Sequence, residues 1–126
     1  MNIGLWILQV LLALVFLAHG WMMVAPPPEI AAQMNANMPR WFSLFIGVAE
    51  LAAFIGLILP GLTRVLPFLV AWAAIGCGLV VGSATVFHTI RGEYSSAAIT
   101  FVLFLLAAGL AYGRARLRPI LPRGAP

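Results

Sequence analysis

Three ionisable side chains interrupt the apolar runs of this 126-residue chain: Glu50, His19 and His88. Glu50 follows Trp41 by nine residues, which is about 13 Å along a helix from an aromatic residue typical of membrane interfaces. A carboxyl group near the bilayer midplane is costly and by default indicates a functional site. Imidazole can exchange protons near neutral pH. We therefore predict that Glu50, His19 and His88 carry the chemistry; the alternative for Glu50 is a structural clamp between helices.

The direction of the helices predicts where these side chains meet. A helical side chain leans toward the N-terminus of its own helix. His19 and His88 then lean inward from the outer ends of two helices, while Glu50 leans outward. We predict a site just below the outer interface, where His19, His88 and Arg91 bind a cofactor or ligand. The alternatives are histidines wetted by lipid headgroups and an ion pair of Arg91 with Glu93 at a helix end.

Composition defines the elements that must position this site. The chain is 63% hydrophobic and 8% charged, with a mean hydropathy of +1.08, which excludes an ordinary soluble domain and a disordered one. Each apolar run is close to the ~20 residues that a membrane helix needs. The sequence predicts an all-α membrane protein, a single domain with a four-transmembrane-helix bundle. The expected helices and basic tail are at 3–25, 41–59, 67–88, 97–113 and 114–126.

Arginine placement predicts the orientation. The N-terminus, the second connection and the tail share one side, which carries five arginines, against two, Arg40 and Arg91, on the other side. Because positive residues collect on the cytoplasmic side, we expect both termini in the cytoplasm. The chain would be a multi-pass protein of the inner (plasma) membrane. Its net charge of +4 is then a topology signal or a contact with membrane lipids, and no nucleic-acid binding is predicted.

Small residues indicate where helices approach each other. Gly47 shares a helical face with Glu50, which predicts that Glu50 points at another helix through a small-residue notch. Ala74, Gly78 and Gly82 recur every four residues and form a face that permits close packing. The partner helix could belong to the same chain, to a second copy or to another protein.

Redox and metal chemistry within the chain are restricted. The one cysteine, Cys77, excludes an intrachain disulfide and is expected to be an inert buried thiol. Two histidines on different helices could ligate a haem, and Glu50 could join them at a metal, but no close ligand spacing such as HxxxH is present. We predict no metal site, and a quinone is the candidate cofactor.

Four stretches resemble the DoxX-like family of small four-helix membrane proteins: LVFLAHG at 14–20, FIGVAELAAFIGLILPG at 45–61, Thr63-Arg64 and ATVFHTIRGE at 84–93. The resemblance extends over nearly the whole chain up to Gly113. It implies the four-helix fold. Through members linked to a thiosulfate:quinone oxidoreductase, it also implies an association with membrane oxidoreductase complexes. It carries over no catalytic residues.

Three functions follow as hypotheses. The first is a subunit of a quinone-linked membrane oxidoreductase, in which the histidines donate hydrogen bonds to the quinone and Glu50 relays protons. Its electrons would come from a partner protein or a soluble donor. The second is a non-enzymatic assembly or accessory subunit, in a homo-oligomer or beside a partner protein. The third is a small proton channel or transporter, which is disfavoured because the sequence has no internal repeat.

Overall fold

The structure, a computed structural model, describes residues 2–126, and this part of the chain is helical with no strand. A short helix, α2 (Pro28–Asn37), lies in the first connection, and a π-helical turn, η1 (Gly113–Leu117), extends the last helix. The long helices are α1 (Ile3–Val24), α3 (Arg40–Thr63), α4 (Leu69–Ile90) and α5 (Tyr94–Tyr112).

Four segments of the described chain are long and apolar enough to cross a membrane. They are α1, α3, α4 and the combined segment Tyr94–Leu117, which joins α5 to η1. The predicted all-α fold with four membrane helices is therefore confirmed. The orientation of the termini relative to the cytoplasm stays a prediction.

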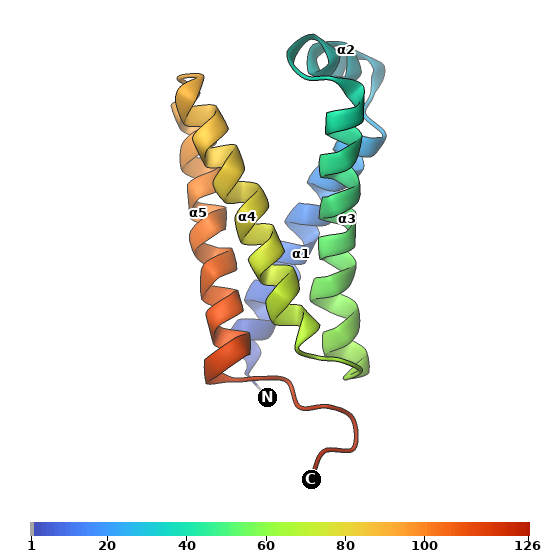
Figure 1. Cartoon of the computed structure of the whole chain (residues 1–126), viewed down its shortest axis with the longest axis vertical. Coiled ribbons are helices and arrows are strands. Elements are labelled where there is room, and N and C mark those ends of the chain that lie inside the picture. Colours follow the sequence, from blue (N-terminus) through green and yellow to red (C-terminus); the bar gives the residue numbers. More distant parts are fainter. Residues whose placement is uncertain (1) are drawn as a thin grey trace.

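The long helices are arranged as two pairs (Figure 1). Helix α1 packs along α3, helix α4 packs along α5, and α3 meets α4 between the pairs. The pairs lie close together at the end that holds both termini and diverge toward the end that holds α2 (Figure 1). The two ends of the molecule are therefore formed by different segments of the chain.

Apolar side chains fill the interior, and many large ones also cover the outside, as expected for a surface that faces lipid. Buried polar side chains are few: Gln9, Ser43, Glu50 and Arg114. The central cluster of buried residues includes Leu12, Ala13, Phe16, Leu57, Ala74, Cys77, Val81, Ala107 and Leu110.

Among the differences between the observed elements and the predicted ranges, three bear on the fold. Helix α3 continues through Pro60 to Thr63, because an interior proline removes one hydrogen bond that membrane helices tolerate losing. Helix α5 begins at Tyr94, immediately after the turn. The segment expected as the start of the basic tail instead forms η1 and buries Arg114, which donates a hydrogen bond to Gln9.

Candidate functional site

Two glycines allow α1 and α3 to cross almost in backbone contact. A Cβ atom added at Gly47 would lie 2.8 Å from the Met23 Cβ atom and 2.9 Å from the Gly20 carbonyl oxygen. A Cβ atom at Gly20 would lie 3.0 Å from the Glu50 Cβ atom. The predicted small-residue notch beside Glu50 is therefore present, and α1 fills it.

This crossing places His19 of α1 against Glu50 of α3. Nδ1 of His19 lies 2.6 Å from Oε2 of Glu50. The Glu50 side chain is 5% exposed, whereas that of His19 is 52% exposed. Among the described residues, Glu50 has no other hydrogen-bond partner, and Nε2 of His19 has none. The pair thus consists of a buried carboxyl group behind a ring whose far side is open.

A carboxyl group in this position controls the imidazole ring. It fixes the ring orientation, selects the tautomer that carries a proton on Nδ1 and stabilises the protonated ring. Nε2 is then the atom that can accept a proton from, or donate one to, a molecule outside the protein. The arrangement is suited to proton exchange or to hydrogen bonding of a carbonyl oxygen.

His88 and Arg91 lie in a separate cluster at the turn between α4 and α5. Nδ1 of His88 lies 2.5 Å from Oε2 of Glu93, and Nε of Arg91 donates to Oε1 of Glu93 at 2.9 Å. Hydrogen bonds from His88 and then from Arg91 hold the pKa of the Glu93 carboxyl group below its ordinary value. The structure therefore brings His19 and Glu50 together and gives His88 and Arg91 a different carboxylate.

Backbone geometry at Gly92 produces this second cluster. Gly92 has φ +74, and the Glu93 and Gly92 N–H groups donate to the carbonyls of His88 and Thr89. This is the Schellman arrangement that closes a helix C-terminus. It turns Glu93 back toward His88. The ion pair considered for Arg91 is observed.

Arg91 also connects the two helix pairs. Its Nη2 donates to Oδ1 of Asn37, the last residue of α2, at 3.2 Å. In Figure 1 the turn after α4 and the helix α2 lie at the same, diverging end of the molecule. The bond therefore links the two helix pairs at this end. Arg40, on the same side, donates to the carbonyls of Met23 and Val24 at the end of α1.

A polar group at the opposite end was not among the predicted site residues. Nε2 of Gln9 donates to the Leu57 carbonyl at 2.6 Å, and Nε of Arg114 donates to Oε1 of Gln9 at 2.8 Å. The Arg114 guanidinium lies 5.0 Å from the centre of the Trp6 ring. One signal was available, because Gln9 is the only amide side chain in the first apolar run.

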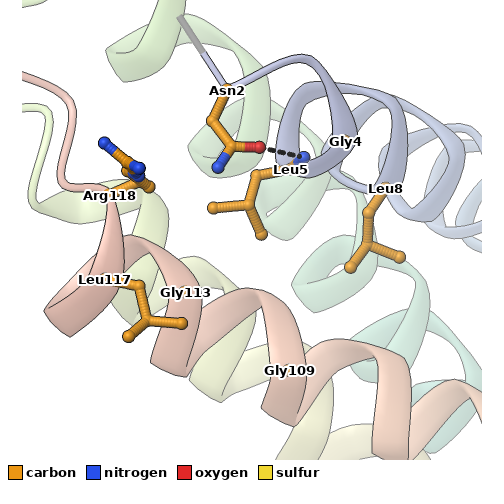
Figure 2. Close-up of a pocket in the computed structure, with 8 residues that line it drawn as sticks. All are labelled: Asn2, Gly4, Leu5, Leu8, Gly109, Gly113, Leu117 and Arg118. Carbon is orange, nitrogen blue, oxygen red and sulfur yellow. Dashed lines mark hydrogen bonds between the residues drawn. The ribbon is translucent and has the colours of Figure 1, made fainter.

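Two cavities lie at the end of the molecule that holds the termini. One, of about 710 Å³, lies between the start of α1 and the end of α5 and is lined largely by apolar residues and glycine (Figure 2). At its edge Asn2 accepts a hydrogen bond from the Leu5 N–H group, as Figure 2 shows. The other, of about 740 Å³, is lined in part by arginines. Neither cavity is lined by His19 or Glu50.

Metal binding gains no support from the arrangement of candidate ligands. Within residues 2–126, no group of three or more His, Cys, Asp or Glu side chains is placed to hold a metal ion. The two histidines each lie against a different glutamate.

Comparison with known proteins identifies the family. Residues 7–110 match the DoxX-like family. The four apolar helices and this match define a DoxX-like membrane protein, and the chain belongs to that family. No curated protein and no solved structure gives a significant match.

Proposed function

We propose that this DoxX-like protein binds a small lipid-soluble carbonyl compound of the quinone type at the His19–Glu50 pair, as a subunit of a redox system in the inner (plasma) membrane. One observation carries the proposal: the buried Glu50 carboxyl group holds Nδ1 of a ring that is otherwise half-exposed. A ring in this state presents Nε2 to a ligand in a fixed orientation.

The chemistry of the pair matches the needs of such a ligand. A carbonyl oxygen accepts a hydrogen bond from the protonated Nε2 of His19. Reduction of a quinone consumes two electrons and two protons. His19 and Glu50 can pass on the two protons one after the other, and the Glu50 carboxylate balances the charge of the protonated His19 ring each time. The electrons come from a partner protein or a soluble donor, which makes the chain a subunit. His88 and Arg91 remain a second proposed contact at the same end of the molecule.

A second candidate function is supported by the same hydrogen bond. The His19–Glu50 contact joins α1 to α3, and so it serves equally as a clamp in a non-enzymatic assembly or accessory subunit. The two functions differ in what Glu50→Gln does. A glutamine oxygen still accepts from the Nδ1–H group, so the clamp survives, but proton exchange through the side chain is lost.

The test uses detergent-purified protein and a short-chain ubiquinone as the probe. We expect His19→Phe to weaken quinone binding about tenfold or more, as loss of a hydrogen bond to a charged donor predicts. We expect Glu50→Gln to remain folded and to lose the pH dependence of binding. Ser83→Ala is the control, because the Ser83 hydroxyl donates only to the Leu79 carbonyl of its own helix.

Each outcome separates the candidates. Unchanged quinone affinity in folded His19→Phe and Glu50→Gln proteins contradicts quinone binding at this pair. Loss of folding in His19→Phe, with Glu50→Gln still folded, supports the clamp. A further variant, His88→Phe, decides whether the second histidine contributes: a reduced affinity adds it to the site, and an unchanged affinity confines the ligand to His19 and Glu50.

A further inference from the structure

The cavity of about 740 Å³ at the end that holds the termini is positively charged. Arg64, Arg114 and Arg118 all line it, and none of the described residues that line it is acidic. The three arginines come from the end of α3, from η1 and from the residue after η1. A volume of this size falls within the range of small-molecule sites.

Arg114 is a buried cation without a counter-ion. It is 6% exposed, its hydrogen bonds go to the neutral acceptors Gln9 and the Arg118 carbonyl, and its Nη2 atom has no hydrogen-bond partner among the described residues. A buried guanidinium that lacks an anion is costly. An unpartnered donor of this kind therefore indicates that a group outside the chain completes the site.

The carboxylates of the chain are not positioned to supply that anion. Of the three glutamates, Glu50 contacts His19 and Glu93 contacts His88 and Arg91. Glu29 lies in α2, at the opposite end of the molecule (Figure 1). No ion pair involving Arg114 occurs within residues 2–126.

The surrounding contacts hold the arginines in place. Gln9 fixes Nε of Arg114 and the Trp6 ring lies against its guanidinium. The π-helical bond from the Arg118 N–H group to the Gly113 carbonyl sets the direction of the chain after η1. The tail then returns, and the Arg123 N–H group donates to the Arg64 carbonyl at 3.0 Å. The tail therefore forms one wall of the cavity, through residues 119–121, and is joined to the backbone of Arg64.

We propose that this cavity binds a phosphate-bearing anion, with Arg64, Arg114 and Arg118 as its ligands. Arginine suits phosphate because its planar guanidinium donates paired hydrogen bonds to two oxygens and stays charged. The cavity lies at the end of four membrane helices, where basic pockets meet lipid headgroups. The phosphate belongs either to an anionic phospholipid or to a soluble phosphate compound. This site is independent of the function proposed for His19 and Glu50.

The test compares three probes on the full-length protein in detergent: dioctanoyl phosphatidic acid, dioctanoylglycerol, which lacks the phosphate, and inorganic phosphate. Binding is measured by isothermal titration calorimetry, and thermal stability is followed in parallel. We expect phosphatidic acid or inorganic phosphate to bind and stabilise the protein, and dioctanoylglycerol to do neither. Binding of phosphatidic acid alone assigns the site to a lipid, and competition by inorganic phosphate assigns it to a soluble anion.

Single variants locate the site. Arg64→Gln and Arg118→Gln should each weaken binding about tenfold, as loss of one charge-assisted hydrogen bond predicts. Arg116→Gln is the matched control. Arg116 lies in η1, as Arg114 does, and carries the same charge as the cavity arginines, but it does not line the cavity. Arg114→Met should abolish binding. The two exposed-arginine variants keep the test decisive even where Arg114→Met does not fold.

Two results would overturn the proposal. One is an equal loss of affinity in Arg116→Gln and in the two cavity variants, which would mean that only the general positive charge of the tail attracts the anion. The other is the absence of binding by both phosphate probes to the folded wild-type protein.

Discussion

At the residue scale, two glutamates each hold a histidine ring, but in opposite surroundings. Glu50 is buried between two membrane helices, and its partner His19 is half-exposed. Glu93 lies at an exposed turn and contacts both His88 and Arg91. Exposed ion pairs contribute little to stability, whereas a buried pair is strongly affected by the loss of one partner. Substitutions at Glu50 should therefore have the larger effect.

Glu93 gives a prediction for the pH dependence of stability. Its pKa is lowered in the folded protein by hydrogen bonds from His88 and then Arg91. A lowered carboxyl pKa stabilises the folded state above the pKa of the unfolded chain, and this stabilisation is lost as the pH falls through the folded pKa. Thermal unfolding should therefore show wild type more stable than Glu93→Gln at pH 7, with the difference closing in acid.

The control for this pH series is Glu29→Gln. This change removes a carboxylate that has no hydrogen-bond partner among the described residues. It measures the effect of lost negative charge alone. A gap between wild type and Glu93→Gln that stays constant from pH 7 into acid would contradict the assignment of this stability to the hydrogen bonds of Glu93.

At the element scale, the approach of α1 to α3 decides the geometry of the candidate site. Gly20 and Gly47 let the two backbones meet, and this contact sets the distance between His19 and Glu50. A comparable approach joins α4 to α5, where a Cβ atom at Gly82 would lie 3.2 Å from the Phe104 ring. The predicted small-residue ladder on α4 therefore packs against a helix of the same chain.

Gly47→Ala should separate α1 from α3. The added methyl group would lie 2.8 Å from the Met23 Cβ atom and 2.9 Å from the Gly20 carbonyl oxygen, and neither can move without shifting a helix. We expect destabilisation of about 1–3 kcal/mol, typical of overpacking. The measurement is thermal or denaturant unfolding in detergent, with histidine NMR to follow the His19 ring.

The matched control is Gly76→Ala, because nothing lies within 4 Å of a Cβ atom at Gly76. Alanine is favoured over glycine in a helix interior by up to about 1 kcal/mol, so this variant should be as stable as wild type or more stable. A Gly47→Ala protein with the stability of Gly76→Ala and an unchanged His19 signal would show that the crossing is looser than described.

The helices themselves were predictable, because runs of about 20 apolar residues have one stable form in lipid. The rotation of each helix about its axis was not. Helices that are apolar on all sides have no amphipathic face to indicate which side faces a neighbour. The sequence therefore placed Glu50 beside a glycine notch, but it brought both His19 and His88 toward Glu50, whereas only His19 contacts it. The Gln9–Arg114 contact, between residues at opposite ends of the chain, was missed for the same reason.

At the scale of the whole molecule, the two ends differ in charge. The diverging end carries Glu29 and Glu93 with two arginines, and the end that holds both termini carries the other five arginines and no acidic residue. Figure 1 places the start of α1 and the tail after η1 at the same end of the molecule. The positive-inside rule then predicts that this end faces the cytoplasm.

Cysteine labelling of intact cells tests this orientation. A membrane-impermeant thiol reagent should label Asn35→Cys in α2 and should reach Ala125→Cys in the tail only after the membrane is broken. The native Cys77 is fully buried and should stay unlabelled in both cases, so the parent protein serves as the control. Labelling of Ala125→Cys, but not Asn35→Cys, in intact cells would reverse the predicted topology.

The π-helical turn after α5 sets the direction in which the tail leaves the helix. In η1 the Arg118 N–H group reaches back five residues to the Gly113 carbonyl, whereas an α-helix reaches back four. Since each α-helical residue rotates the chain by about 100°, one residue more or fewer in this turn swings everything after it by roughly a quarter of a circle. With one residue fewer in the turn, the same arginines would point in a direction about 100° away. The direction of Arg118 and of the returning tail therefore depends on the number of residues in one turn. The charge of these residues alone does not determine that direction.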